Sequence, residues 1–111
     1  NNTLVIEGAG GVMVPLNDKY FIMDLIKKFD AETIIVIQNY LGSINHSLLT
    51  FDVLKNKGIK IIGLVFNGPP HALSEKIILS YTGVPCLASI SPEQEINKKI
   101  ILKYTKNFEK I

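Results

Sequence analysis

The chain has 111 residues, enough for one ordinary domain with a buried core. Apolar residues make up 47% and charged residues 20% of it, which is typical of a packed soluble protein and excludes a disordered tail. The formal net charge is only +2, no basic stripe alternates with aromatic residues, and no apolar run reaches about 18 residues, so we expect neither a nucleic-acid partner nor a membrane span.

Short β-rich runs alternate with amphipathic stretches in the first half of the chain. Residues 3–6 form an apolar run that ends at a glycine cluster, which predicts a strand. Residues 20–29 carry apolar side chains at helical spacing, and residues 33–37 are a continuous run of β-branched residues that predicts a second strand. A further helix is predicted over residues 44–57, stopped by Gly58 in the manner of a C′ glycine.

The second half of the chain continues this alternation. Residues 60–66 predict a strand, residues 71–81 a helix and residues 85–89 a short strand. The last helix is predicted to start with an N-cap serine, a proline at N1 and a glutamine at N3 that completes a capping box: Ser91, Pro92 and Gln94. Strands that are apolar on both faces and separated by helices indicate a parallel sheet covered on both sides. We therefore expect a doubly wound α/β fold and a single domain over residues 1–111.

Ligands of such sheets bind beyond the carboxyl ends of the strands, and this rule selects three junctions in the sequence. The first junction puts a lone carboxylate, Glu7, at a strand tip before glycines that let a ligand approach the backbone closely. Glu7 could hold Mg²⁺ beside nucleotide phosphates or could merely face solvent, and the spacing alone favours neither. The glycines form neither a Walker A loop nor a G-x-G-x-x-G motif.

The second and third junctions offer two more candidate sites. After residues 33–37 the chain reaches a helix start with Ser43 as the expected N-cap. The free N–H groups there could bind a carboxylate or phosphate, although simple capping, with His46 on the surface, is the plainer interpretation. Asn67 ends the next strand, and its amide could read an adenine edge or stabilise the turn before two prolines. His71 is given no role.

The remaining sequence features are mostly exclusions. The single cysteine, Cys86, allows no internal disulfide, and its apolar surroundings predict a buried structural thiol. His46 and His71 lack helical metal-ligand spacing, so we expect no zinc site. Without a signal-peptide pattern we expect a cytoplasmic protein. The chain starts at Asn1 and enters the first predicted strand almost at once, which we interpret as a cut amino end.

Motifs at these junctions resemble dethiobiotin synthase. EGAGG at residues 7–11 is followed by VPL at residues 14–16, then by YLGSINH at residues 40–46 and VFN at residues 65–67. They occur in the same order and at similar intervals as in that family. The similarity covers nearly all of the chain and weakens after about Gly68.

The resemblance implies a P-loop NTPase-like fold and an enzyme that closes the ureido ring of dethiobiotin from 7,8-diaminononanoate, CO₂ and ATP, with Mg²⁺. It also implies a homodimer with active sites at the subunit interface, where a helix start takes the substrate carboxylate. Glu7 would ligate Mg²⁺ between the β- and γ-phosphates. The implied nucleotide-binding residues are Glu7, Gly8, Gly10, Gly11, Asn67, Ile90, Ser91, Pro92 and Glu95. The implied substrate-binding residues are Leu41, Gly42, Ser43, Ile44 and Asn45.

The chain departs from the family in one large respect. The family begins with a strand and a phosphate-binding loop that ends in Gly-Lys-Thr, and these 111 residues contain no such loop. We therefore assign no catalytic residue and expect the chain by itself to be inactive. Two alternatives stay open: a non-catalytic α/β interaction or regulatory domain, and a nucleotide-binding domain like that of cobyrinic acid synthases. LGSINH at residues 41–46 favours dethiobiotin synthase over both.

Overall fold

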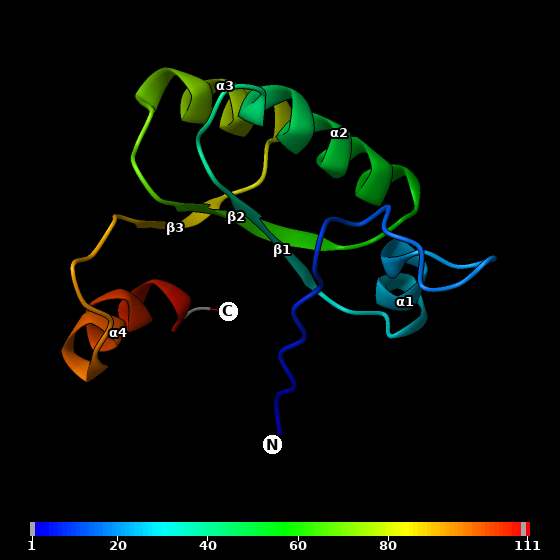
Figure 1. Ribbon diagram of the computed structural model, residues 1–111, viewed down its shortest axis with the longest axis horizontal. Helices are drawn as coiled ribbons and strands as arrows, with labels where there is room; N and C mark the ends of the chain where they lie inside the picture. Colours follow the sequence, from blue (N-terminus) through cyan, green and yellow to red (C-terminus); the bar gives the residue numbers. More distant parts are fainter. Residues whose placement is uncertain (1, 110) are drawn as a thin grey trace.

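Three parallel strands form the centre of the protein. The computed structural model, which describes residues 2–109 and residue 111, places them in the order β1 (Thr33–Ile37), β2 (Ile61–Asn67) and β3 (Cys86–Ile90) (Figure 1). Both pairs of neighbours are parallel, so β2 lies in the middle and the carboxyl ends of all three strands meet at one edge. The predicted parallel α/β sheet is confirmed, and the strands at residues 33–37, 60–66 and 85–89 lie within one residue of their predicted bounds.

Two crossover helices cover one face of this sheet. Figure 1 shows α2 (Ser43–Asn56) and α3 (Ala72–Thr82) side by side above the strands, and they also contact each other. Apolar side chains that alternate along the strands meet the apolar stripes of these helices between the two layers. The buried cluster consists of Ile35, Ile37, Phe51, Leu54, Ile59, Leu64, Phe66 and Ile78.

The opposite face of the sheet is covered unevenly. The last helix, α4 (Lys98–Thr105), and the 3₁₀ turn η1 (Lys106–Phe108) lie below β3, and η1 contacts that strand (Figure 1). Val36 points away from α2 and α3 and is 63% exposed, whereas its register partner Val65 on β2 is 4% exposed. The sheet is therefore covered on both faces at the central strand β2, as expected, whereas one face of β1 is exposed.

The helix ends follow local signals in some places and not in others. Gly58 has φ +72 after α2, and the Ile59 N–H donates to the Leu54 carbonyl at 3.0 Å, which is the expected C′ glycine in a Schellman arrangement. At the other end, Gly42 with φ +97 is the N-cap of α2, so the expectation that Ser43 would cap this helix is wrong. Ser43 is the first helical residue and is 3% exposed.

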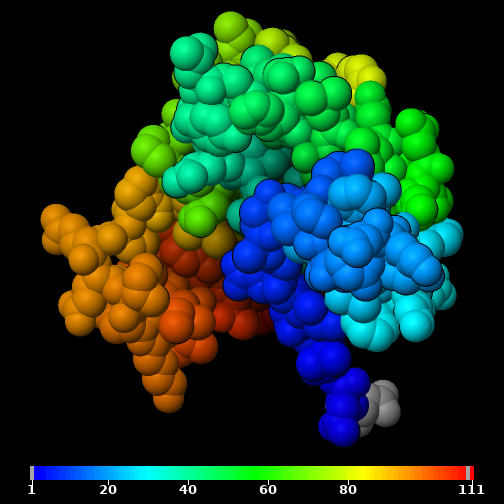
Figure 2. Space-filling view, turned by 45° about the vertical axis from the view of Figure 1, so that its right-hand side comes forward, coloured from blue at the N-terminus to red at the C-terminus, as the bar shows by residue number. Residues whose placement is uncertain are grey.

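Residues 3–6 do not form the predicted strand. Among the described residues they pair with no other segment, and Leu4 and Val5 are 81% and 88% exposed. A strand is defined by its hydrogen bonds to a neighbour, and the described part of the chain supplies no neighbour here. Figure 2 shows this amino-terminal segment projecting from the body of the molecule.

The last helix starts later than its sequence signals indicated. Residues 91–97 are irregular and α4 begins at Lys98, so the predicted capping box of Ser91, Pro92 and Gln94 is wrong. The Asn97 side chain is the actual cap, and its Oδ1 accepts a hydrogen bond from the Ile100 N–H at 3.0 Å.

Three further observations complete the comparison with the sequence. The amphipathic stretch at residues 20–29 forms the shorter helix α1 (Ile22–Lys28), in which Asp24 accepts a hydrogen bond from the Phe21 N–H at 2.8 Å. Cys86 is exposed at the start of β3, so its expected burial is wrong. Within the described residues, every helix is too short or too polar to cross a membrane.

Candidate functional site

The loops that follow β2 and β3 meet at the carboxyl edge of the sheet. Asn67 and Ile90, the last residues of these strands, are register partners, and the Gly68 N–H donates to the Ile90 carbonyl at 2.8 Å. Because the two strands end side by side, whatever follows them is held close together. This pairing places the asparagine beside the segment that leads into α4.

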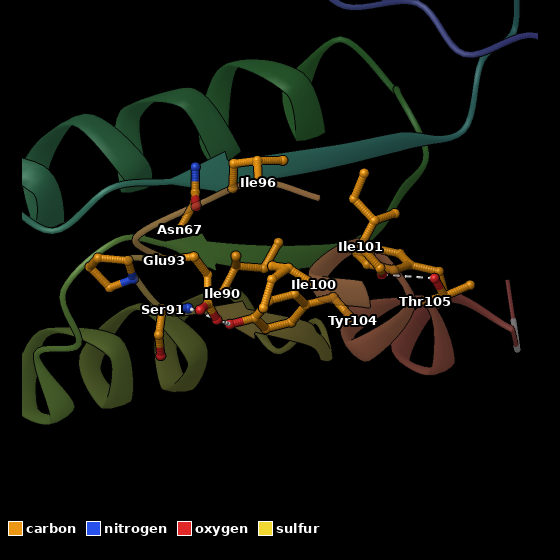
Figure 3. A pocket seen from close by; sticks show the side chains of 11 residues that line it. Asn67, Ile90, Ser91, Glu93, Ile96, Ile100, Ile101, Tyr104 and Thr105 are labelled. Carbon is orange, nitrogen blue, oxygen red and sulfur yellow. Dashed lines mark hydrogen bonds between the residues drawn. The ribbon is translucent and has the colours of Figure 1, made fainter. Parts of the chain in front are cut away.

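A pocket of about 460 Å³ opens at this meeting point. It is lined by the last residues of β2 and β3, by residues of the irregular segment 91–97, and by residues of α4 and η1 (Figure 3). An amide beside an apolar wall is a combination that suits a planar heterocycle with a polar edge. The apolar lining consists of Ile90, Ile96, Ile100, Ile101 and Phe108.

This pocket gathers four of the nine residues that the resemblance assigned to the nucleotide. Asn67, Ile90, Ser91 and Pro92 all line it, whereas Glu95 does not. The carboxylate that does line the pocket is Glu93, two residues earlier. The irregular course of residues 91–97 places Glu93 in the pocket lining.

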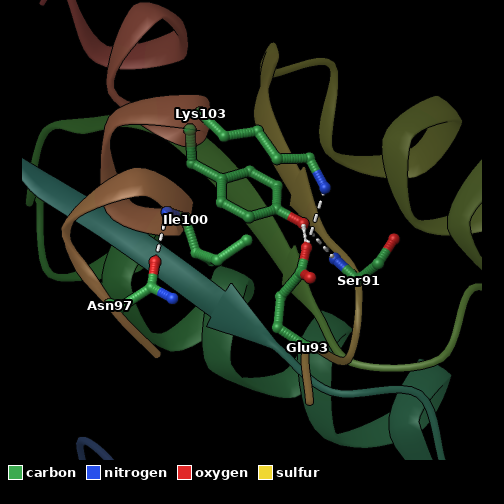
Figure 4. A network of polar contacts seen from close by, with 6 residues as sticks. Ser91, Glu93, Asn97, Ile100 and Lys103 are labelled. Carbon is green, nitrogen blue, oxygen red and sulfur yellow. Dashed lines mark hydrogen bonds and ion pairs between the residues drawn. The ribbon is translucent and has the colours of Figure 1, made fainter. Parts of the chain in front are cut away.

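Glu93 is the centre of a polar network between this loop and α4 (Figure 4). Its Oε1 accepts hydrogen bonds from the Tyr104 hydroxyl at 2.6 Å and from the Lys103 Nζ at 2.8 Å. The Tyr104 oxygen in turn accepts a hydrogen bond from the Ser91 N–H at 3.3 Å. The bond from Lys103 holds the pKa of Glu93 below its usual value, and Glu93 raises the pKa of Lys103, so both are charged near neutral pH. Sequence reasoning missed this network, because no local spacing links residues 93 and 104.

A second, larger pocket of about 880 Å³ lies at the carboxyl ends of β1 and β2. The start of α2 forms one side, and the turn after β2 with the start of α3 forms the other. Its lining includes every residue that the resemblance assigned to the substrate: Leu41, Gly42, Ser43, Ile44 and Asn45. The unbonded N–H groups of a helix start are suited to bind a carboxylate, as the second junction suggested.

Asn39 and His71 line this second pocket, and His46 bonds to Tyr40, another residue of its lining. The Asn39 Nδ2 donates to the Pro69 carbonyl at 3.2 Å and to Glu75 at 2.8 Å, which ties the loop after β1 to the loop after β2. His46 is hydrogen-bonded through Nδ1 to the Tyr40 hydroxyl at 2.7 Å. His71, to which the sequence gave no role, is the N-cap of α3, and its ring accepts from the Ser74 N–H at 3.3 Å.

Glu7 and the glycines after it lie outside both pockets. Gly10 and Gly11 have φ +81 and +103, a conformation that favours glycine, so this segment does form a glycine-dependent turn. The turn leads into α1, since the Met23 N–H donates to the Val12 carbonyl at 3.0 Å. Among residues 2–109 and 111 no three histidine, cysteine, aspartate or glutamate side chains gather as a metal cage. A single carboxylate such as Glu7 is compatible with Mg²⁺ binding, because proteins often hold Mg²⁺ through one carboxylate together with substrate phosphates.

A parallel α/β sheet with its pockets at the carboxyl ends of the strands defines the class of α/β domains that bind ligands at that edge. Comparison with known families agrees with this class. The model of the AAA domain family matches residues 1–99, and the chain belongs to this family.

Curated relatives make the resemblance more specific. The chain is 54% identical over 103 residues to the ATP-dependent dethiobiotin synthetase BioD of Cytophaga hutchinsonii, an alignment that covers 93% of this chain and 50% of that protein. It is 45% identical to the BioD protein of Christiangramia forsetii, in an alignment that covers 96% of this chain and 51% of that protein. It is 37% identical to the BioD protein of Paramagnetospirillum magneticum, with 80% of this chain and 43% of that protein covered. The chain thus spans about half the length of the curated relatives it matches. The resemblance to dethiobiotin synthase is confirmed, and it is supported over the two alternatives.

Proposed function

We propose that this chain is the half of an ATP-dependent dethiobiotin synthetase that holds the adenine of ATP and the carboxylate end of the substrate. The observation that carries the proposal is the meeting of Asn67, Ile90 and Ser91 in one pocket, because the resemblance assigns all three to the same nucleotide. The names of the relatives support the choice of ATP and of biotin synthesis.

The whole enzyme would close a ureido ring in three steps. One amine of 7,8-diaminononanoate takes up CO₂ as a carbamate, ATP phosphorylates that carbamate, and the second amine displaces phosphate as the ring closes. Asn67 would present its amide to the adenine edge while the apolar wall covers the ring, and the start of α2 would bind the substrate carboxylate. Mg²⁺, when bound, offsets the phosphate charge, and Glu7 is the carboxylate of this chain that would hold it.

A nucleotide titration of the chain tests the adenine site. We expect ATP to shift the amide NMR signals of residues 67, 68, 90, 91 and 93 in the ¹⁵N-labelled chain, and GTP at the same concentration to shift them less. Asn67→Leu should remove this discrimination, because leucine offers neither donor nor acceptor. Asn56→Leu, at the exposed end of α2 and outside both pockets, is the control. Equal responses to ATP and GTP, or shifts confined to other segments, would rule out the proposed adenine site.

The same chain should not make dethiobiotin by itself. It contains no Gly-Lys-Ser or Gly-Lys-Thr sequence, and in P-loop enzymes the backbone and lysine of that loop hold the phosphates. We expect no ring product and no ADP from 7,8-diaminononanoate, bicarbonate, Mg²⁺ and ATP. Turnover on the order of 1 s⁻¹, a rate typical of enzymes, would contradict this expectation.

The proposal includes a homodimer in the cytoplasm that uses the start of α2. Tyr40, Leu41 and Leu49 are large, exposed apolar side chains in this region, with exposed fractions of 54%, 101% and 56%. Light scattering should show a mass above 12.3 kDa that rises with concentration. Leu41→Asp should lower that mass, whereas Leu102→Asp, at a leucine on α4 that is 55% exposed, should not. A chain that stays monomeric at high concentration would argue against this interface.

A further inference from the structure

The segment between β3 and α4 has few attachments to the rest of the protein. Residues 91–97 form neither helix nor strand, although they form part of the wall of the first pocket. Within the described chain, every hydrogen bond that residues 91–96 make is to Tyr104 or Lys103. An irregular segment with so few bonds keeps its position only while those bonds persist.

Tyr104 makes the two bonds that span this segment. Its hydroxyl donates to Glu93 at 2.6 Å and accepts from the Ser91 N–H at 3.3 Å, so one oxygen joins two points of the loop (Figure 4). A phenol can do this because it is donor and acceptor at once. Within the described residues the Lys103 Nζ bonds to one residue of the loop, Glu93, and its side chain is 57% exposed, so it reinforces one bond without bridging the loop.

The groups that hold the loop are also groups that line the pocket. Ser91, Glu93 and Tyr104 all contribute to the pocket on which Asn67 also borders (Figure 3). The position of residues 91–93 therefore affects the shape of the space beside Asn67. The tyrosine ring belongs to helix α4, and its hydroxyl joins that helix to the loop.

We propose that Tyr104 is a positioning residue for nucleotide binding, whose hydroxyl holds residues 91–93 as part of the wall of the pocket that Asn67 also lines. This inference rests on the proposed adenine site and adds to it a residue outside the resembling motifs. Without the hydroxyl, residues 91–93 are no longer held in place. A nucleotide must then order this loop when it binds, and the affinity of the protein for the nucleotide falls.

The test compares two variants that each remove one tyrosine hydroxyl from a carboxylate. Tyr104→Phe removes the bond to Glu93, and Tyr81→Phe removes the bond of Tyr81 to Asp52, which is 2.9 Å long and lies outside both pockets. Affinity for ATP, the free energy of unfolding in urea and the exchange rate of the Ser91 amide proton are measured for each. Tyr104→Phe should weaken ATP binding about tenfold, which corresponds to about 1.4 kcal/mol, and should speed exchange at Ser91. Tyr81→Phe should leave both unchanged.

Glu93→Gln supplies the conservative comparison. Glutamine keeps an oxygen that accepts from the Tyr104 hydroxyl, so this variant should bind ATP within about twofold of the unaltered chain. If Tyr104→Phe fails to fold, Glu93→Leu removes the other end of the same bond and takes its place, with the same expected loss.

The outcomes separate this inference from the proposed function. No ATP binding by the unaltered chain overturns both. Binding that is unchanged in Tyr104→Phe, or weakened equally in Tyr81→Phe, overturns the positioning role and leaves the adenine site standing. A tenfold loss in Glu93→Gln also overturns it, because the charge of Glu93 would then matter rather than its bond to Tyr104.

Discussion

Gly42 is the position at which a single methyl group should damage both the fold and the second pocket. It is the N-cap of α2 with φ +97 and ψ −2, and it lines the pocket assigned to the substrate. A left-handed conformation costs a residue with a Cβ roughly 1–2 kcal/mol. The φ of Gly42 lies well beyond the left-handed optimum near +57°, so we place Gly42→Ala at the upper end, about 2 kcal/mol.

The space around Gly42 adds little to this cost. A Cβ there would lie 3.4 Å from the His46 Cε1, which is the short end of ordinary contact. The penalty is therefore mainly that of the backbone. For a domain of this size it corresponds to a fall in Tm of about 10 °C.

Gly83→Ala is the matched control. Gly83 ends α3 with φ +66, closer to the left-handed optimum, and a Cβ there meets nothing within 4 Å. We expect about 1 kcal/mol for this variant, which is about half the cost at Gly42. Urea unfolding of both variants measures the difference, and titration with 7,8-diaminononanoate should show weaker binding only for Gly42→Ala. Equal costs at the two positions, or a larger cost at Gly83, would refute the argument from φ.

Three other changes test the packing, the acid response and the metal site. Gly63→Ala should lower the free energy of unfolding in urea by about 2 kcal/mol through overpacking, because its Cβ would lie 2.5 Å from the Leu87 Cγ. Leu87→Ala in the same chain should recover part of that loss. Strict additivity of the two single-variant losses would contradict the contact. Since Lys103 lowers the folded-state pKa of Glu93, the stability that this bond contributes is present above the unfolded pKa and is lost as pH falls through the folded pKa. The free energy of unfolding should therefore fall more steeply from pH 7 to pH 3 in the unaltered chain than in Glu93→Gln. Parallel curves for the two proteins would count against a stabilising bond between Lys103 and Glu93. In the complete enzyme Glu7→Gln should lower kcat about a hundredfold, or roughly 3 kcal/mol, and retention of half the rate would show that Glu7 only faces solvent.

The sequence alone determined the elements whose signals are local. Apolar runs within residues 33–37 and 60–66 predicted β1 and β2, because such runs are typical of strands in a parallel sheet. Gly58 ended α2 as expected because the left-handed C′ position favours glycine whatever the surroundings. Asn67 and residues 41–45 were assigned to candidate sites because they follow strands of a parallel sheet, whose carboxyl ends share one edge.

Tertiary structure decided the features that depend on partners far along the chain. Residues 3–6 have the composition of a strand but no neighbour among the described residues, and composition cannot supply one. Ser91 and Asn97 are both residue types that cap helices well, and Asn97 is the residue that caps α4. Glu93 is turned toward Lys103 and Tyr104. Capping residues compete within a few positions for small free energies, so contacts across the fold choose between them. The pocket opposite Asn67 exists only because that choice was made.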